Sequence, residues 1–176
     1  MALKLWSPLA PLVLALASLV FGIDQTHKWW MIDVYDITSK SPVALTSYFE
    51  FVMVWNRGVS YGLLTSHTQT LLIVLSLAIT AVLWIWACRM ERALGAAALA
   101  LVIGGALANA LDRATRGAVA DFFHFHYGNF SWYVFNLADV AIVAGVALLL
   151  YESVFESGDG DRRGKAGFQD QLPESE

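Results

Sequence analysis

Four long apolar segments constrain this chain more than any other feature of its sequence. They cover residues 5–23, 71–88, 93–111 and 132–151; the first three contain no charged residue, and the fourth contains only Asp139. A helix crosses the hydrocarbon core of a bilayer with about 20 mostly apolar residues. The sequence therefore predicts an all-α integral membrane protein with four transmembrane helices.

The charge distribution divides the chain into two predicted parts. Charged residues make up 15% of the 176 residues, against about 25% in a typical soluble domain. This composition excludes a disordered chain and a nucleic-acid-binding protein with a basic face. Residues 154–176 hold six acids and three bases, and so carry most of the net charge of −4. We predict a transmembrane domain over residues 1–153 and a polar, disordered cytoplasmic tail over residues 154–176.

The connections between the segments predict where function lies. Four spans place both termini on one side, and the short Arg-containing link at residues 89–92 favours cytoplasmic termini. The first segment could also be a signal peptide, but its length and the lack of a small-x-small cleavage site favour an uncleaved helix. The long connections, 24–70 and 112–131, then lie outside. The aromatic and β-branched residues 48–55 predict a small β-structure between the first two helices.

Two carboxylates near the predicted span ends are the strongest candidates for chemistry. An acid near hydrocarbon costs about 2.5–3.5 kcal/mol on insertion scales, so it is a functional candidate by default. Asp139 lies just inside the fourth segment, and Asp121 lies in an apolar stretch before it, where it could also be a surface-loop carboxylate. Two such acids at one depth could share a proton, as an aspartic protease requires.

Polar residues at helical spacing accompany these acids. Asn109, Asp112 and Arg113 fall on one helical face, and adjacent Asp112 and Arg113 are each expected to pair with another element rather than with each other. Taken alone, this group could be a polar clamp between helices. Asn136 and Asp139 are also three residues apart. A helix that begins near Asn136 would favour the ionised form of Asp139, whereas the apolar surroundings would oppose it.

Other chemistries find less support in the sequence. His124 and His126 would point apart on a helix and together on a strand. No third ligand accompanies them, so we predict loop residues rather than a metal site. Ser60 has no evident base, and the lone Cys88 lies in an apolar run. A proton-coupled transporter or channel subunit would have polar residues throughout the membrane depth, whereas here they gather near one side. A structural assembly subunit would not need two carboxylates at one depth.

Five blocks of this sequence, in order, resemble those of the bacterial lipoprotein signal peptidases, also called signal peptidase II. The resemblance covers roughly residues 10–152. It departs from the family pattern at His27, where Thr is usual, at Tyr61, where Phe is common, and at Ala108, where Gly is usual. The blocks are Asp-Gln-Thr-His-Lys at 24–28, Asn-Arg-Gly-Val-Ser-Tyr-Gly at 56–62, Gly-Gly-Ala-Leu-Ala-Asn-Ala-Leu-Asp-Arg at 104–113, Val-Ala-Asp-Phe at 119–122 and Phe-Asn-Leu-Ala-Asp at 135–139.

The resemblance implies a membrane aspartic endopeptidase whose catalytic pair is Asp121 and Asp139. It implies a substrate, a prolipoprotein whose cysteine carries diacylglycerol, and cleavage just before that cysteine. It further implies a metal-independent, globomycin-sensitive enzyme of the bacterial inner membrane, with its site near the outer leaflet and among membrane lipids; a monomer would suffice. The residues implied to support the pair or position the peptide are Asp24, Lys28, Asn56, Gly58, Asn109, Asp112, Arg113 and Asn136.

Overall fold

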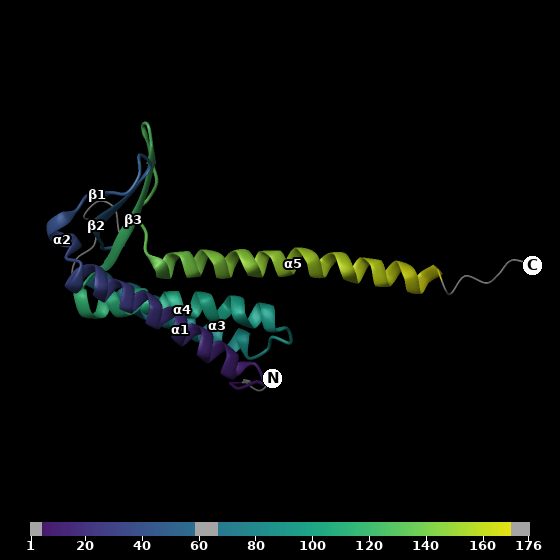
Figure 1. Cartoon of the computed structure of the whole chain (residues 1–176). Coiled ribbons are helices and arrows are strands. Elements are labelled where there is room, and N and C mark those ends of the chain that lie inside the picture. The colour runs from purple at the N-terminus through teal and green to yellow at the C-terminus, as the bar shows by residue number, and fades with distance from the viewer. Residues whose placement is uncertain (1–4, 59–66, 170–176) are drawn as a thin grey trace, which may run out of the picture.

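The protein is a bundle of four long helices with a small β-sheet at one end (Figure 1). The computed structural model describes the backbone of residues 5–58 and 67–169 and the side chains of residues 5–58 and 69–154. We call the end with the sheet the site end and the opposite end the far end. The elements in order are α1 (Ala10–Trp29), the π-helix η1 (Trp30–Val34), α2 (Ile37–Lys40), β1 (Val43–Ala44), β2 (Phe49–Asn56), α3 (His67–Ala87), α4 (Ala93–Arg116), β3 (Val119–Tyr127), β4 (Phe130–Ser131) and α5 (Leu137–Gln169).

Four of the helices are long and apolar enough to cross a membrane, which confirms the predicted fold class. These spans are Ala10–Val34, Gln69–Ala87, Ala93–Arg116 and Leu137–Val154. The first extends beyond the predicted residues 5–23 because the charges that end the uncharged run, Asp24 and Lys28, are paired inside the bundle through the contact of Lys28 with Asp112 of α4. The fourth begins at Leu137 rather than at residue 132, because the preceding residues pair with strand β3.

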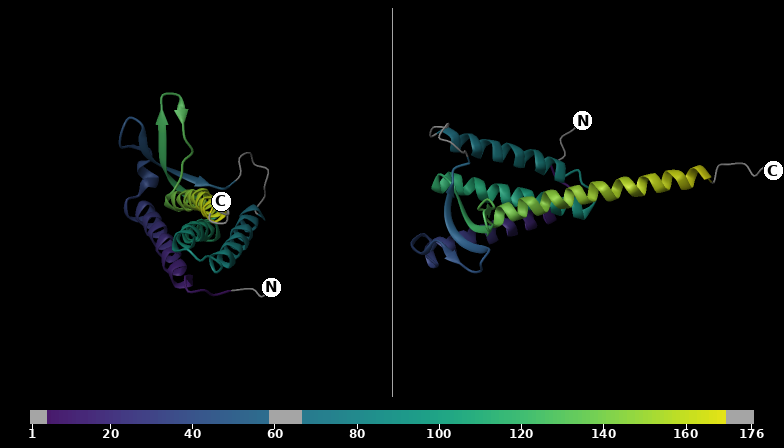
Figure 2. Two further views of the ribbon diagram at one scale, coloured as in Figure 1. Left: turned by 90° about the vertical axis from the view of Figure 1, so that its right-hand side faces the viewer. Right: turned by 90° about the horizontal axis from the view of Figure 1, so that it is seen from above.

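Helix α4 lies at the centre of the bundle and packs against α1, α3 and α5 (Figure 2). Of its most apolar window, 61% is buried, against 6–22% for the other spans. Glycines allow this close packing. A Cβ at Gly104 would lie 2.6 Å from the carbonyl oxygen of Ala17 on α1, and a Cβ at Gly105 would lie 2.5 Å from that of Ala138 on α5. The Gly-Gly pair therefore lets α1 and α5 pack closely against two neighbouring faces of α4.

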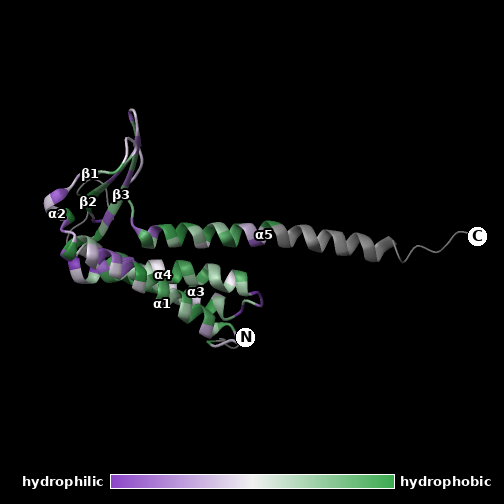
Figure 3. Ribbon diagram, in the orientation of Figure 1, coloured by the Kyte–Doolittle hydropathy of each residue, from purple (hydrophilic) through white to green (hydrophobic). Residues whose placement is uncertain are grey.

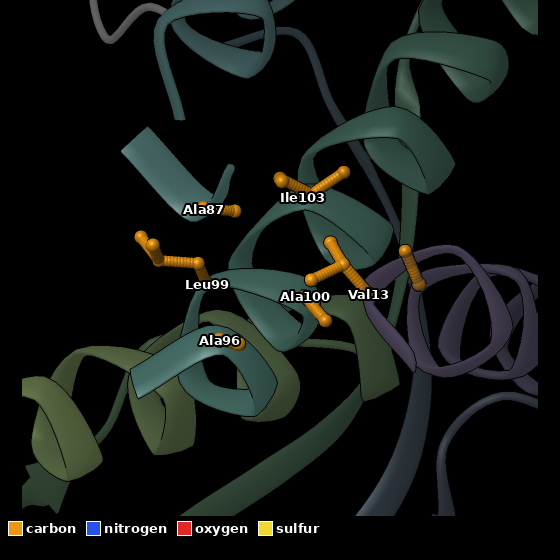
Figure 4. Packing of buried hydrophobic residues seen from close by; sticks show 7 residues of the cluster. Val13, Ala87, Ala96, Leu99, Ala100 and Ile103 are labelled. Atoms are coloured by element: carbon orange, nitrogen blue, oxygen red, sulfur yellow. The ribbon is translucent and has the colours of Figure 1, made fainter. Parts of the chain in front are cut away.

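Small and aliphatic side chains fill the far half of the bundle. Figure 4 shows Val13 of α1 beside Ala100 and Ile103 of α4, and Ala87 of α3 near Leu99. Nearly all of these side chains are inaccessible to solvent. Because lipid tails are as apolar as these residues, close van der Waals contact rather than the hydrophobic effect holds this half together.

The sheet is larger than the sequence predicts. Its four antiparallel strands run in the order β1-β2-β3-β4, so both long connections contribute to it. The predicted β-structure at residues 48–55 corresponds to β2, but Asp121 and His124 lie on strand β3 rather than in a loop. The pairing of Val54 with Asp121 and of Glu50 with His124 joins segments that are far apart in sequence. Because such pairing leaves no local signal in the sequence, the sequence does not predict strand β3.

Polarity follows this architecture. The spans are largely apolar, while polar residues concentrate at the site end and in the sheet (Figure 3). Both ends of the described chain lie toward the far end of the bundle (Figure 1). Helix α5 continues past the bundle to Gln169, so residues 154–169 are helical where the sequence predicts a disordered tail. The division of the chain at residue 153 stays a prediction.

Candidate active site

A buried cluster of charges joins α1 to α4 at the site end. The Nζ of Lys28, whose side chain is fully buried, lies 2.8 Å from Asp24 and 2.6 Å from Asp112. Arg116, one turn beyond Asp112, binds the second oxygen of that carboxylate at 2.7 Å. Two acids and two bases thus cancel in formal charge. Buried charges are tolerated only when they are paired in this way.

Two asparagine side chains connect this cluster to the two candidate acids. Asn109 on α4 accepts a hydrogen bond from Lys28 at 3.2 Å through Oδ1 and donates one to Asp139 at 2.9 Å through Nδ2. Asn136 donates to Asp121 at 2.6 Å and to the Oδ1 of Asn109 at 3.3 Å. A continuous chain of hydrogen bonds therefore runs from Lys28 through the two amides to both carboxylates.

Asp121 is held from two sides. It lies on β3 with 1% of its surface exposed. One carboxylate oxygen accepts from Asn136, and the other accepts from Asn56 of β2 at 3.0 Å. Burial, aided by the negative charge of Asp139, raises the pKa of Asp121 to about 6, although the hydrogen bonds from Asn136 and Asn56 and the charge of Lys28 act in the opposite direction. A carboxyl group with this pKa can hold a proton or release one near neutral pH.

Asp139 caps the start of α5. The Oδ1 of Asn136 accepts the backbone N–H of Asp139 at 3.0 Å, and the carboxylate of Asp139 accepts the backbone N–H of Asn136 at 3.2 Å. This reciprocal pair is a capping box. It confirms that the helix begins next to Asn136, and it places Asp139 in the first turn, where the helix dipole favours a negative charge.

The β-sheet closes the other side of the site. The Oδ1 of Asn56 accepts the backbone N–H of Gly58 at 2.8 Å, so this side chain links the turn after β2 to Asp121. Gly58 has a φ of 78°, a left-handed conformation that favours glycine. The rest of this block, residues 59–62, including Ser60 and Tyr61, lies outside the described residues.

Arg113 is near the acids without forming an ion pair among the described residues. It donates to the carbonyl oxygen of Asn109 at 3.3 Å, while Asp112 pairs with Lys28 of α1. The expectation that each residue pairs with another element is therefore confirmed for Asp112, whereas the hydrogen bond that Arg113 makes among the described residues stays within α4. His27, one of the three departures from the family pattern, packs its ring against those of Phe122 and Phe123, with centroid distances of 5.5 and 5.3 Å.

Two members of the network were not singled out from the sequence. Gln25 donates to Asp112 and to the carbonyl oxygen of Ala108, both at 3.2 Å, and thereby fastens α1 to α4. Ala108, in place of the usual Gly, is fully buried at this contact. The i, i+4 spacing of Asp112 and Arg116 is a sequence signal for their ion pair. Gln25 carries no such signal beyond its position in the Asp-Gln block.

The histidine pair belongs to a separate cluster on the sheet. The Nδ1 of His124 lies 2.8 Å from the carboxylate of Glu50, its Nε2 lies 2.8 Å from the hydroxyl of Ser131, and its ring lies 5.4 Å from that of His126. Because a carboxylate only accepts, the Nδ1 carries the proton in this contact. Within the described part of the chain, no three His, Cys, Asp or Glu residues are placed to hold a metal ion.

Comparison with known proteins points to one family. The model of the signal peptidase II family matches residues 16–155. The lipoprotein signal peptidase of Methylocella silvestris is 50% identical over 153 residues, covering 85% of this chain and 90% of that protein. That of Beijerinckia indica is 48% identical, covering 78% and 84%.

The fold also has solved counterparts. Two structures of bacterial membrane enzymes, determined by the in meso method at 2.3 and 1.9 Å resolution, each give a TM-score of 0.70 at 20% and 21% identity. They cover 85% and 86% of this chain and 91% and 96% of their own. The shared architecture agrees with the family match, and the chain belongs to the signal peptidase II family of membrane peptidases.

Proposed function

We propose that this protein is an aspartic endopeptidase that removes the signal peptide from diacylglyceryl-modified prolipoproteins by cleaving just before the lipidated cysteine. The observation that carries this proposal is the bridging of Asp121 and Asp139 by Asn109 and Asn136. Membership of the signal peptidase II family and the names of the relatives support the substrate class.

The chemistry follows from a pair of acids that share one proton. One carboxylate takes a proton from water as the water oxygen attacks the scissile carbonyl carbon, while the other, protonated, hydrogen-bonds the carbonyl oxygen. The C–N bond then breaks, and the leaving amine takes a proton from the pair. The raised pKa of Asp121 supports a carboxyl group that can hold or release the shared proton near neutral pH.

The position of the site suits a substrate that stays in the bilayer. The acids lie in the first turn of α5 and near the start of β3, where the spans meet the sheet. A lipidated cysteine would bring its neighbouring peptide bond to this depth. We place the protein in the bacterial inner membrane, with cytoplasmic termini at the far end and the site near the outer leaflet. All of the named residues come from one chain, so a monomer suffices.

Product analysis tests this function. The purified full-length protein in lipid nanodiscs is given a diacylated precursor and the same precursor without lipid. We expect cleavage of the lipidated form only, mass spectra of a product that begins at the modified cysteine, and inhibition by globomycin. Cleavage of both forms at similar rates, or at another bond, would contradict the proposal.

A further inference from the structure

An apolar groove runs along the bundle on a side away from the proposed active site. Helices α1 and α3 both pack on α4, and the groove lies between them with α4 as its floor. It has a volume of about 550 Å³. Its walls include Leu14 and Phe21 of α1 and Leu77 and Ala81 of α3, and its floor includes Ile103 and Leu107 of α4.

The far end of the groove is marked by tryptophans. The N-terminal segment crosses there, because the indole N–H of Trp84 donates to the carbonyl oxygen of Leu5 at 3.2 Å and the ring of Trp6 lies 6.5 Å from that of Trp84. Tryptophan side chains favour the depth of the lipid headgroups. The groove therefore begins at the membrane interface and runs toward the bilayer centre.

The length of the groove matches one leaflet. From Leu77 to Ile85 of α3 it follows eight residues, or about 12 Å at a helical rise of 1.5 Å per residue. The hydrocarbon core is about 30 Å thick, so one leaflet accounts for about 15 Å. A transmembrane helix would need a contact surface through both leaflets, whereas a single acyl chain needs only one.

A charged group beyond the end of the groove also suits a lipid. Arg89 is exposed and lies four residues beyond Ile85, just after α3 ends. It places a positive charge at the interface, where a lipid phosphate would lie.

We propose that this groove binds one acyl chain of a glycerophospholipid from the far-end leaflet, with the lipid phosphate beside Arg89. The site is separate from the candidate acids, and its occupant is a membrane lipid rather than the peptidase substrate. An acyl chain in the groove would give α1 and α3 a continuous apolar contact that their own side chains leave open.

Photolabelling tests the proposal. The full-length protein is placed in phosphatidylglycerol nanodiscs with a trace of phospholipid that carries a diazirine on one acyl chain, and the labelled residues are mapped by mass spectrometry. We expect several-fold more label on Leu77 and Ala81 than on Val82, which is 64% exposed on α3 but does not line the groove. Label distributed according to exposure alone would overturn the proposal.

A matched pair of variants and a competition sharpen the test. Ala81→Phe fills the groove and should reduce its labelling several-fold, whereas Val82→Phe, at the next residue, should leave it unchanged. Excess unlabelled phospholipid should displace the label from the groove. Displacement by an apolar transmembrane peptide but not by phospholipid would show that the groove is a peptide site, and would overturn the assignment to a lipid.

Discussion

At the site end of the bundle, α1, α4 and α5 meet through charges and amides, whereas at the far end α1, α3 and α4 meet through alanine and aliphatic side chains. Lys28 and Asp112 are as fully buried as Leu99 and Ala100. The two ends differ in the substitutions that their contacts tolerate. Close apolar packing depends on shape, while a buried ion pair depends on every partner being present. The site end therefore has less tolerance for single substitutions, and it is the end that holds the candidate acids.

The largest effect is expected at Lys28. Lys28→Met removes the cation between Asp24 and Asp112 and leaves both carboxylates in the interior. The free energy of unfolding should fall by about 3–5 kcal/mol, the usual cost of breaking a buried ion pair. Denaturation in detergent micelles measures this, with Lys40→Met as the control, because Lys40 is exposed. Equal losses in the two variants would contradict the account of the charge cluster.

The pH dependence of stability probes Asp121. Its pKa is 3.8 in the unfolded chain and about 6 in the fold, so the unfolded state releases its proton first as the pH rises. The unfolding free energy should therefore decrease between about pH 4 and pH 7, by at most about 3 kcal/mol. Asp121→Asn removes this dependence, so its stability relative to wild type should increase over that range. A difference that does not change with pH would refute the raised pKa.

Glycine substitutions test the apolar contacts. A Cβ at Gly145 would lie 2.6 Å from the carbonyl oxygen of Ala98, so Gly145→Ala must separate α5 from α4 and should cost about 1–3 kcal/mol. Gly22→Ala is the matched control, because no atom lies within 4 Å of the added methyl. Thermal unfolding of both variants measures the difference. A loss at Gly22 as large as that at Gly145 would show that close packing is not the cause.

The smallest effect is expected at the edge of the charge cluster. Arg116 binds the same carboxylate as Lys28, but 28% of its side chain is exposed. Arg116→Gln should therefore cost no more than about 1 kcal/mol, since water screens the pair and Lys28 remains. The same denaturation assay measures it. A loss equal to that of Lys28→Met would mean that burial does not set the strength of these pairs.

The sequence predicts this fold well where the signal is local. The four spans and the start of the fourth helix near Asn136 follow from composition and spacing. It fails where a contact joins distant segments. The length of α1 depends on the pairing of Lys28 with Asp112, and β3 depends on its pairing with β2. The approach of Asp121 to Asp139 depends on both of these long-range contacts. The sequence spacing of the two acids therefore suggests a shared site but does not show that the acids meet.

The most direct test of the central claim is the single-turnover cleavage rate of a diacylated precursor by Asp121→Asn and Asp139→Asn, each verified as folded. The account predicts a fall of at least about 100-fold in both variants, because a positioned acid or base contributes about 10²–10⁴-fold. Asp33→Asn, at an exposed acid on η1, should cleave at the wild-type rate. Cleavage near that rate by either of the first two folded variants would contradict an aspartate-pair mechanism.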